Sequence, residues 1–183
     1  MNGDNLNETI KSCTEFNEIL ADILSNETVQ EMQNYIQHGD VSCYSHCYYV
    51  SYYTYLICKK LKLDYKSATR GAMLHDLFLY DWHTTSPADI NEKGAHAWAH
   101  PRIALKNASK IFNLNDIEKD IIKNHMWPVT VRLPKTREAF IVSCMDKYSA
   151  TAETFMNCRN KITRSRIYRY AYVFLGFFIF RIF

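Results

Sequence analysis

Residues 71–81 read GAMLHDLFLYD and place an adjacent His75-Asp76 pair directly after small and apolar residues. His75 shares helical spacing with Ala72 before it and Leu79 after it, which predicts a buried helix face through this stretch. Burying an imidazole and a carboxylate is costly unless they pair with each other or bind a metal ion. Because both groups are good ligands for a divalent ion, the stretch predicts either a buried ion pair or part of a metal site.

Four more residues of these two types occur on or at the end of separate predicted helices, each facing an apolar stripe. They are His46, His100, His125 and Asp146. Taken singly, each histidine has an ordinary interpretation, either as a satisfied core residue or as a helix C-terminal residue that interacts favourably with the helix dipole. An aspartate within an apolar stripe, such as Asp146, is costly to bury without a partner, and a metal ion would supply one. The ordered set therefore favours a metal site more strongly than any single member does.

The order H…HD…H…H…D resembles the HD superfamily of metal-dependent phosphohydrolases, whose core motif is H…HD…D. That motif is matched by His46, His75, Asp76 and Asp146. The two additional histidines, His100 and His125, resemble the subset of the family that has a binuclear metal site. The resemblance covers residues 35–157 and implies an all-α bundle of about seven helices, in a single HD domain over residues 1–183.

Six nitrogen and oxygen ligands are too many for one tetrahedral site and fit two divalent ions about 3.5–4 Å apart. His46, His75, Asp76 and Asp146 are assigned to one ion, and Asp76, His100 and His125 to the second. A ligand set without thiolate favours iron or manganese, with zinc, nickel, cobalt or magnesium as alternatives.

Two histidines are candidates for the third metal histidine, because His96 and His100 are one helical turn apart and both could face a metal ion. His100 is preferred, since a histidine directly before a proline is the third metal histidine in the sequences that this one resembles. Pro101 also predicts that a helix begins there, with His100 at its N-terminus.

The resemblance implies hydrolysis of a phosphomonoester or phosphodiester, with a nucleotide as the expected substrate and metal-activated water as the nucleophile. The expected catalytic residues are Asp76, His100 and His125. Candidate substrate contacts, chosen because they lie near ligands, are Arg70, Trp82 and Lys147. Three alternatives stay open: a mononuclear-metal nucleotidase, an iron-dependent oxygenase and a non-catalytic nucleotide-binding module.

The chain departs from the family motif directly after the HD pair. Many HD-family sequences carry Gly-Lys two and three residues after this pair, whereas this chain has Phe78 and Leu79 there. The family's lysine role is therefore not transferred.

Composition narrows the class of protein. Hydrophobic residues make up 48% of the 183 residues, and the 5 Gly and 4 Pro are few, which together favour a globular domain of long helices. The net charge of +3 has mixed signs and no basic stripe, which argues against DNA or RNA as a partner. The 6 cysteines are interpreted as reduced structural thiols, and the polar N-terminus does not resemble a signal peptide, so a cytoplasmic location is expected.

Periodicity and capping residues also predict helix boundaries. A second short helix is expected through residues 29–36, and a longer one is expected to begin near residues 42–45. Asp64 and Asn115 are the predicted caps of the two helices that follow them, and a long helix is expected from Thr136.

The remaining segments are expected to frame the site. Residues 1–13 are interpreted as a frayed polar arm and residues 80–99 as a loop at the rim of the cleft. For His38, a surface position at a helix end is favoured over a position that lines the cleft. The tail, residues 162–183, contains an almost wholly apolar run at 171–180, shorter than the ~20 residues that span a bilayer. A core helix or a homodimer contact is favoured for this tail over an anchor at a membrane surface.

Overall fold

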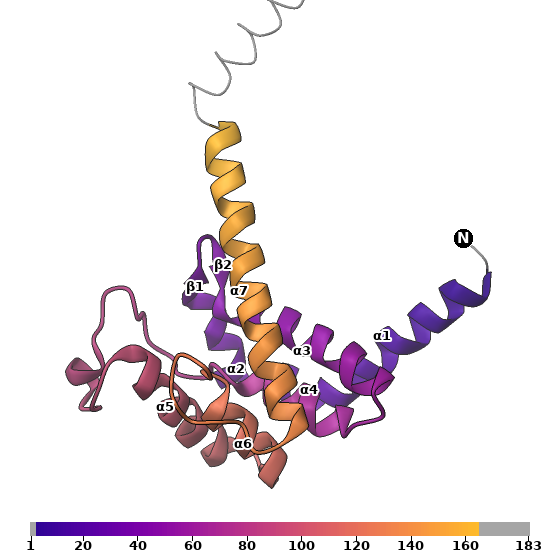
Figure 1. Ribbon diagram of the computed structural model, residues 1–183, viewed down its shortest axis with the longest axis horizontal. Helices are drawn as coiled ribbons and strands as arrows, with labels where there is room; N and C mark the ends of the chain where they lie inside the picture. The colour runs from indigo at the N-terminus through magenta and orange to yellow at the C-terminus, as the bar shows by residue number, and fades with distance from the viewer. Residues whose placement is uncertain (1–2, 165–183) are drawn as a thin grey trace, which may run out of the picture.

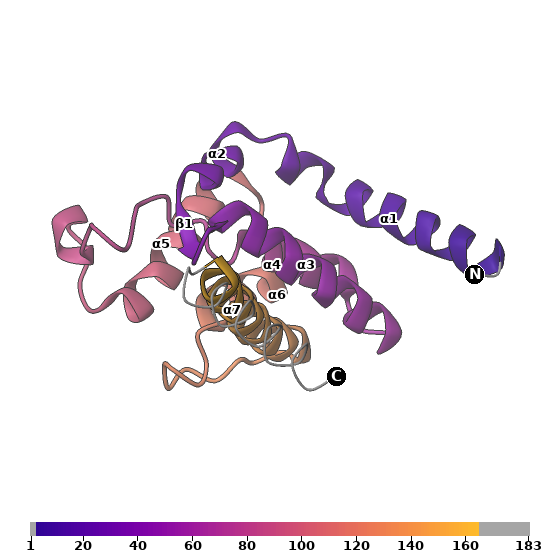
Figure 2. The ribbon, with the colours of Figure 1, turned by 90° about the horizontal axis from the view of Figure 1, so that it is seen from above.

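The computed structural model describes residues 3–164, with the side chains of residues 14–155. Within that range the chain forms seven α-helices, two short 3-10 helices and one two-stranded sheet, which confirms the all-α class. Four helices pack against one another: α3 (Cys43–Lys60), α4 (Tyr65–Leu74), α6 (Asp116–Asn124) and α7 (Arg137–Arg164). Helices α1 (Gly3–Leu24) and α5 (His96–Ile111) flank this group (Figures 1 and 2).

The N-terminal region departs from its predicted boundaries. Helix α1 spans Gly3–Leu24, so most of the expected polar arm is helical. The single short helix expected next is divided into α2 (Glu27–Gln30) and a 3-10 helix, η1 (Glu31–Asn34). Asn26 caps α2, because its side chain accepts hydrogen bonds from two backbone N–H groups of the first turn.

A small hairpin follows, which the sequence analysis did not predict. Strand β1 (Ile36–His38) pairs antiparallel with β2 (Val41–Ser42). Gly39 permits the turn between them, since its φ of 64° lies in the left-handed region. Strand β1 contacts both α3 and α7, so the hairpin places Gln37 and His38 beside the middle of the bundle.

Helices α3 (Cys43–Lys60) and α4 (Tyr65–Leu74) begin close to the predicted residues. The Asp64 side chain accepts a hydrogen bond from the Ser67 backbone N–H at 3.0 Å, which confirms the predicted cap of α4. The prediction that the helix face continues to Leu79 is wrong, because α4 ends at Leu74 and Leu79 has a φ of 55°.

The early end of α4 has a tertiary cause. The Cys43 thiol contacts the carbonyl oxygen of Asp76 at 3.3 Å, and the Gln37 side-chain amide donates to the Asp76 carboxylate at 2.5 Å. These partners come from β1 and from the start of α3, and they hold the chain in a turn after Leu74. Contacts from distant segments therefore override the helical periodicity of the local sequence.

Helix α5 (His96–Ile111) begins earlier than predicted. Pro101 lies inside the helix, and His100 lies one turn from its start instead of at its N-terminus. The additional turn is held from outside, because the His96 ring stacks on Trp82 and its Nδ1 is 2.7 Å from the Tyr80 hydroxyl. The preceding loop contains a 3-10 helix, η2 (Pro87–Ile90).

The last two helices agree with their predicted starts. Helix α6 (Asp116–Asn124) begins with a capping box in which Asn115 and Glu118 satisfy each other's backbone N–H groups. Helix α7 (Arg137–Arg164) begins after Thr136, whose hydroxyl accepts from the Ala139 N–H at 3.2 Å. The first part of α7 packs in the bundle, and its C-terminal part projects away from it (Figure 1).

Two buried apolar clusters hold these helices together. The larger one centres on side chains of α1, α3, α4 and α5, among them Phe16, Tyr55 and Leu74. The smaller one joins α3, α4, α6 and α7. Gly71 on α4 allows α6 to approach, because a Cβ at that position would lie 2.8 Å from Ile121 Cδ1. Each large aliphatic side chain buried in this way contributes about 1.5–3 kcal/mol.

Two sequence predictions concern segments at the edges of the described region. Residues 165–183, which carry the apolar run, lie outside it, so the predicted core or dimer role of the tail stays a prediction. Across the helices that the structure does describe, none combines the length and the apolar character needed to cross a membrane. Among cysteines with described side chains, Cys43, Cys47, Cys58 and Cys144 are free thiols.

Candidate metal centre

The six predicted ligands come from five different elements and meet in the middle of the bundle. His46 lies in the first turn of α3, and His75 and Asp76 follow the end of α4. His100 lies on α5, His125 caps the C-terminus of α6, and Asp146 lies on α7. All six are buried, with between 0% and 8% of their surface exposed.

Asp76 stands between two histidines. Its Oδ1 lies 3.3 Å from His100 Nε2 and 3.4 Å from His125 Nε2. The two Nε2 atoms are themselves 2.9 Å apart. Three ligand atoms so close together could all bind one ion, as expected for the second ion of the pair.

The other ligands lie beside this trio. His46 Nε2 is 3.1 Å from Asp146 Oδ1, and His75 Nε2 is 3.4 Å from Asp76 Oδ2 and 3.8 Å from Asp146 Oδ1. Three overlapping groups, each within 4.8 Å, contain the six residues: His46/His75/Asp76, His75/His125/Asp146 and Asp76/His100/His125. The fold therefore brings the whole predicted set together.

The hydrogen bonds of three histidines define which ring nitrogen can bind a metal ion. The Nδ1 atoms of His75, His100 and His125 lie 2.7, 2.9 and 2.9 Å from backbone carbonyl oxygens of the preceding turn. Because a carbonyl oxygen can only accept, each Nδ1 carries a proton, and in the neutral ring Nε2 is left with a lone pair. This is the arrangement in which metal-binding histidines are usually held.

Two buried atoms at the centre have no hydrogen-bond partner among the residues that the structure describes. They are His75 Nε2 and Asp76 Oδ1. A hydrogen bond between His100 Nε2 and His125 Nε2 would need a second proton on one ring, and burial lowers the pKa of His125 to about 4. Buried polar atoms without partners are costly, and a cation among them would satisfy the lone pairs and the carboxylate together. The residues therefore fit a divalent metal ion.

The electrostatics around His46 and Asp76 also favour positive charge at the cluster. Burial opposes a charge on His46, but its hydrogen bonds to Asp146 and Glu153 outweigh burial and raise its pKa well above the usual value. Burial likewise opposes the negative charge of Asp76, but the nearby His75 holds the pKa of that carboxyl well below its usual range. Protons or metal ions can supply the positive charge that these carboxylates require.

A cavity of about 230 Å³ opens onto the cluster. Asp76, His100 and Asp146 line it, together with Trp82, Lys147 and Val129. Two of the three predicted substrate contacts, Trp82 and Lys147, therefore face the space beside the ligands. Lys147 Nζ also donates to Asp146 Oδ2 at 3.0 Å and to the His125 carbonyl oxygen at 2.5 Å.

The third predicted substrate contact, Arg70, lies elsewhere. Its guanidinium donates to both Asp22 carboxylate oxygens, at 2.6 and 2.9 Å, and to Glu118 at 3.0 Å. Arg70 is absent from the lining of the cavity and instead joins α4 to α1 and α6. The expectation that Arg70 reaches a substrate phosphate is corrected, because three carboxylate contacts hold its guanidinium away from the ligands.

His96 lines the cavity but does not join the ligand groups. Its ring stacks on Trp82 at 5.0 Å and on His100 at 4.6 Å between centroids. Burial and the neighbouring His100 lower its pKa to about 4, so the ring is neutral near pH 7. The geometry thus brings His100, and not His96, to Asp76. The loop that carries Trp82 lines the cavity, as predicted for the rim.

Three further polar residues at the cluster were not assigned there from the sequence. Gln37 donates to Asp76 Oδ2, and Glu153 lies 3.1 Å from His46 Nδ1. His38, interpreted as a surface residue, is half-buried and lines the cavity. Glu153 shares the face of α7 that carries Asp146, which is a signal in the sequence. The position of His38 matches the alternative that was not favoured, and Gln37 gave no signal, because the hairpin that positions both residues was not predicted.

The comparisons with known proteins agree with this geometry. A model of the HD domain matches residues 43–151, more than half of the chain, and this range contains all six predicted ligands. No curated protein and no solved structure gives a match. The HD domain is a helical domain of metal-dependent hydrolases, and its presence implies binding of a divalent metal ion. Given this match and the convergence of the H, HD, H, H and D residues in one helical bundle, the chain belongs to the HD domain family.

Proposed function

We propose that this protein is a phosphohydrolase that cleaves a phosphomonoester or phosphodiester of a nucleotide with metal-activated water. The observation that carries the proposal is the meeting of His75, His100 and His125, each with Nδ1 donating to a carbonyl oxygen, around the Asp76 carboxylate. Asp76, His100 and His125 are the proposed catalytic residues, because Asp76 and His100 line the cavity that would receive the substrate and His125 contacts both of them.

Two divalent ions are proposed, with His46, His75, Asp76 and Asp146 binding one and Asp76, His100 and His125 the other. When bound, two such ions would hold phosphate oxygens and lower the pKa of a bound water toward about 7. Asp76 belongs to both sets, and its carboxylate has one oxygen near His75 and the other near His100 and His125.

Iron or manganese is the proposed metal. Cys43 and Cys47 lie near Asp76, and thiolates there would favour zinc. Burial raises the pKa of both thiols above the usual value, so they stay protonated and are poor ligands. Oxygen and nitrogen ligands remain, which suit iron and manganese. Free thiols in the described region also agree with the reducing cytoplasm that we propose as the location.

Lys147 and Trp82 are the proposed substrate contacts. Lys147 is a cation at the edge of the cavity, where it can neutralise a phosphate oxygen while its contact with Asp146 keeps it in place. Trp82 presents an aromatic ring next to His96, a surface that suits stacking of a base or another flat group. The cavity of about 230 Å³ is below the ~300 Å³ of typical ligand pockets, so we expect it to hold the phosphate and the group next to it.

A substrate screen tests this proposal. Protein purified without oxygen or chelators would be assayed with Mn²⁺ or Fe²⁺ on p-nitrophenyl phosphate, bis-p-nitrophenyl phosphate and nucleoside mono-, di- and triphosphates, with Asp76→Ala as the control. Hydrolysis that requires metal and Asp76 is the expected result. Oxygen consumption with iron would instead indicate the oxygenase alternative, and nucleotide binding without turnover would indicate a non-catalytic module.

A further inference from the structure

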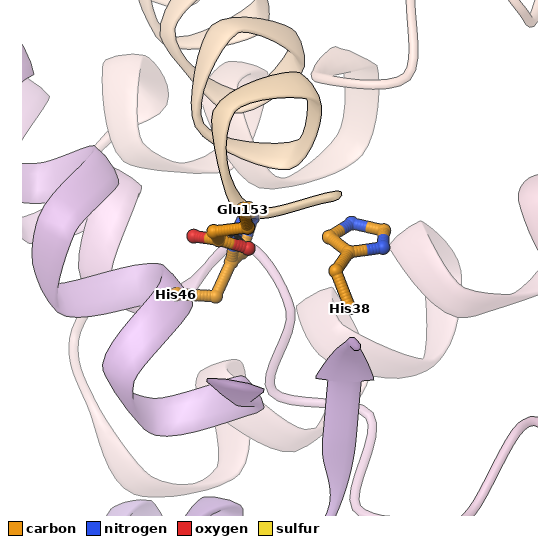
Figure 3. A group of neighbouring side chains, drawn as sticks. All are labelled: His38, His46 and Glu153. Atoms are coloured by element: carbon orange, nitrogen blue, oxygen red, sulfur yellow. Dashed lines mark hydrogen bonds and ion pairs between the residues drawn. The ribbon is translucent and has the colours of Figure 1, made fainter. Parts of the chain in front are cut away.

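Glu153 contacts the cluster from outside the region that the family model matches, residues 43–151. Both of its carboxylate oxygens lie 3.1 Å from His46 Nδ1. The His46 side chain is 0% exposed and that of Glu153 is 11% exposed, so the contact is shielded from water. Figure 3 shows the Glu153 carboxylate against the His46 ring, with His38 to one side.

His46 is held differently from the other three histidines of the cluster. Their Nδ1 atoms donate to backbone carbonyl oxygens, whereas His46 Nδ1 faces a carboxylate. The opposite nitrogen, His46 Nε2, lies 3.1 Å from Asp146 Oδ1. Asp146 and Glu153 are two turns apart on one face of α7, so this helix places one carboxylate at each end of the ring.

We propose that Glu153 is a positioning residue: it accepts the Nδ1 proton of His46 and thereby directs Nε2 toward the metal centre. A carboxylate at this place fixes both the tautomer and the rotation of the ring, and it makes the imidazole a stronger donor to the metal ion than a carbonyl acceptor would. The inference rests on the proposed function, because it takes His46 to be a ligand.

A separate cation site is the competing interpretation, since ligand atoms of His38, His46 and Glu153 lie within 4.8 Å of one another. His46 cannot serve both purposes as a neutral ring, because Nε2 faces Asp146 and only one nitrogen has a lone pair. His38 and Glu153 alone would leave such an ion with two protein ligands. The His38 ring meets the His46 ring edge-on at 5.3 Å between centroids, which is ordinary aromatic packing.

The test is calorimetric titration of the metal-free full-length protein with Mn²⁺. Glu153→Ala is expected to weaken Mn²⁺ binding about 10–100-fold, the usual effect of losing a residue that orients a metal-binding histidine. Glu153→Gln keeps an oxygen that can accept the Nδ1 proton, so its affinity should lie between those of Glu153→Ala and the wild type. Thr154→Ala, at the adjacent exposed position of the same helix, is the matched control and should bind as the wild type does. Circular dichroism would verify that each variant is folded.

The outcomes separate the possible failures. Wild-type affinity in Glu153→Ala, together with lost binding in His46→Ala, would overturn the positioning role and leave the metal centre standing. Loss of one Mn²⁺ per chain in both Glu153→Ala and His38→Ala would overturn it in favour of a separate cation site. Absence of Mn²⁺ binding by the wild-type chain would overturn the proposed centre and the role of Glu153 together.

Discussion

Asp76 and Asp120 are both buried aspartates, with 2% and 8% of their surface exposed, yet their surroundings differ. The Asp120 Oδ2 atom accepts hydrogen bonds from the backbone N–H groups of Lys135 and Thr136 and from the Thr136 hydroxyl, at 2.8–2.9 Å. Its Oδ1 accepts from the Asn124 side chain at 2.7 Å. Asp76 has a donor, Gln37, on Oδ2 only.

The difference separates a carboxylate that the protein itself satisfies from one that it leaves partly unsatisfied. Each buried carboxylate must be compensated for the water that it loses. At Asp120 the protein itself supplies all the donors, and the result ties α6 to the start of α7. At Asp76 the neighbouring atoms are imidazole nitrogens, and a bound cation would complete the compensation, as the proposed function requires. Burial alone did not distinguish the two residues, whereas the identity of the neighbouring atoms did.

Substitutions at Asp76 and its neighbour His75 are expected to have the largest effect on metal binding and activity. Asp76→Ala and His75→Ala should each abolish metal binding and hydrolysis, because each removes a ligand from the centre of the cluster. Elemental analysis and phosphoester turnover would measure the two losses. Normal turnover by either variant would mean that the cluster is a buried ion-pair network and that the contrast with Asp120 has no functional meaning.

His125→Ala tests how the ligands divide between two ions. Its Nε2 contacts Asp76 and His100, the proposed second set, so its loss should reduce the metal content from about two ions to about one per chain. Elemental analysis of anaerobically purified protein would show the change. If the variant keeps two ions, His125 is a core residue, and the second ion must be held by other residues.

Asp120→Ala should have the opposite pattern, with full metal content and reduced stability. The substitution leaves the backbone N–H groups of Lys135 and Thr136 without their acceptor, and unsatisfied buried donors typically lower the free energy of unfolding by about 1–3 kcal/mol. Urea unfolding and elemental analysis would report the two properties separately. Loss of metal in a folded Asp120→Ala protein would contradict the distinction between the two aspartates.

The smallest effect is expected on stability, at a third carboxylate, Glu15. Like Asp120, Glu15 accepts hydrogen bonds from the protein, but it is more exposed. Its hydrogen bonds to Lys59, Tyr55 and Tyr65 lower its pKa from 4.5 to about 2. Because the folded pKa is lower, the unfolded chain binds the proton first, and the stabilisation is present above pH 4.5 and lost as the pH falls toward 2.

This contribution should be about 1 kcal/mol or less, since the Glu15 side chain is 29% exposed and solvent screens its ion pair. Urea unfolding of the metal-free protein at pH 6 and pH 3 would compare the wild type with Glu15→Gln. The stability advantage of the wild type at pH 6 should shrink at pH 3. An advantage that is equal at both values would show that the Glu15 charge contributes nothing.

Much of the site could be predicted because its ligands are chemically conspicuous. A histidine or aspartate on an apolar helix face is costly to bury without a partner, which made these residues candidates. The order of the six and their resemblance to the HD superfamily then identified them as one ligand set. The caps at Asp64 and Asn115 were also predictable, since a capping side chain bonds to residues two or three positions away in its own segment.

The predictions that failed, the end of α4 and the start of α5, depended on contacts with other segments of the chain. Helix α4 ends early because Cys43 and Gln37 contact Asp76, and α5 starts early because Trp82 and Tyr80 contact His96. Local periodicity carries no information about such partners.

The sequence by itself therefore determined the helical periods and the local caps, because these follow from the chemistry of a residue and its near neighbours. The ordered H, HD, H, H and D set was also legible in the sequence, through its resemblance to the HD superfamily. Only the tertiary structure decided that Arg70 is bound by Asp22 and Glu118, that Gln37 holds Asp76, and that Glu153 reaches His46. These contacts join residues 39 to 107 positions apart, and their partners are defined by how the helices pack.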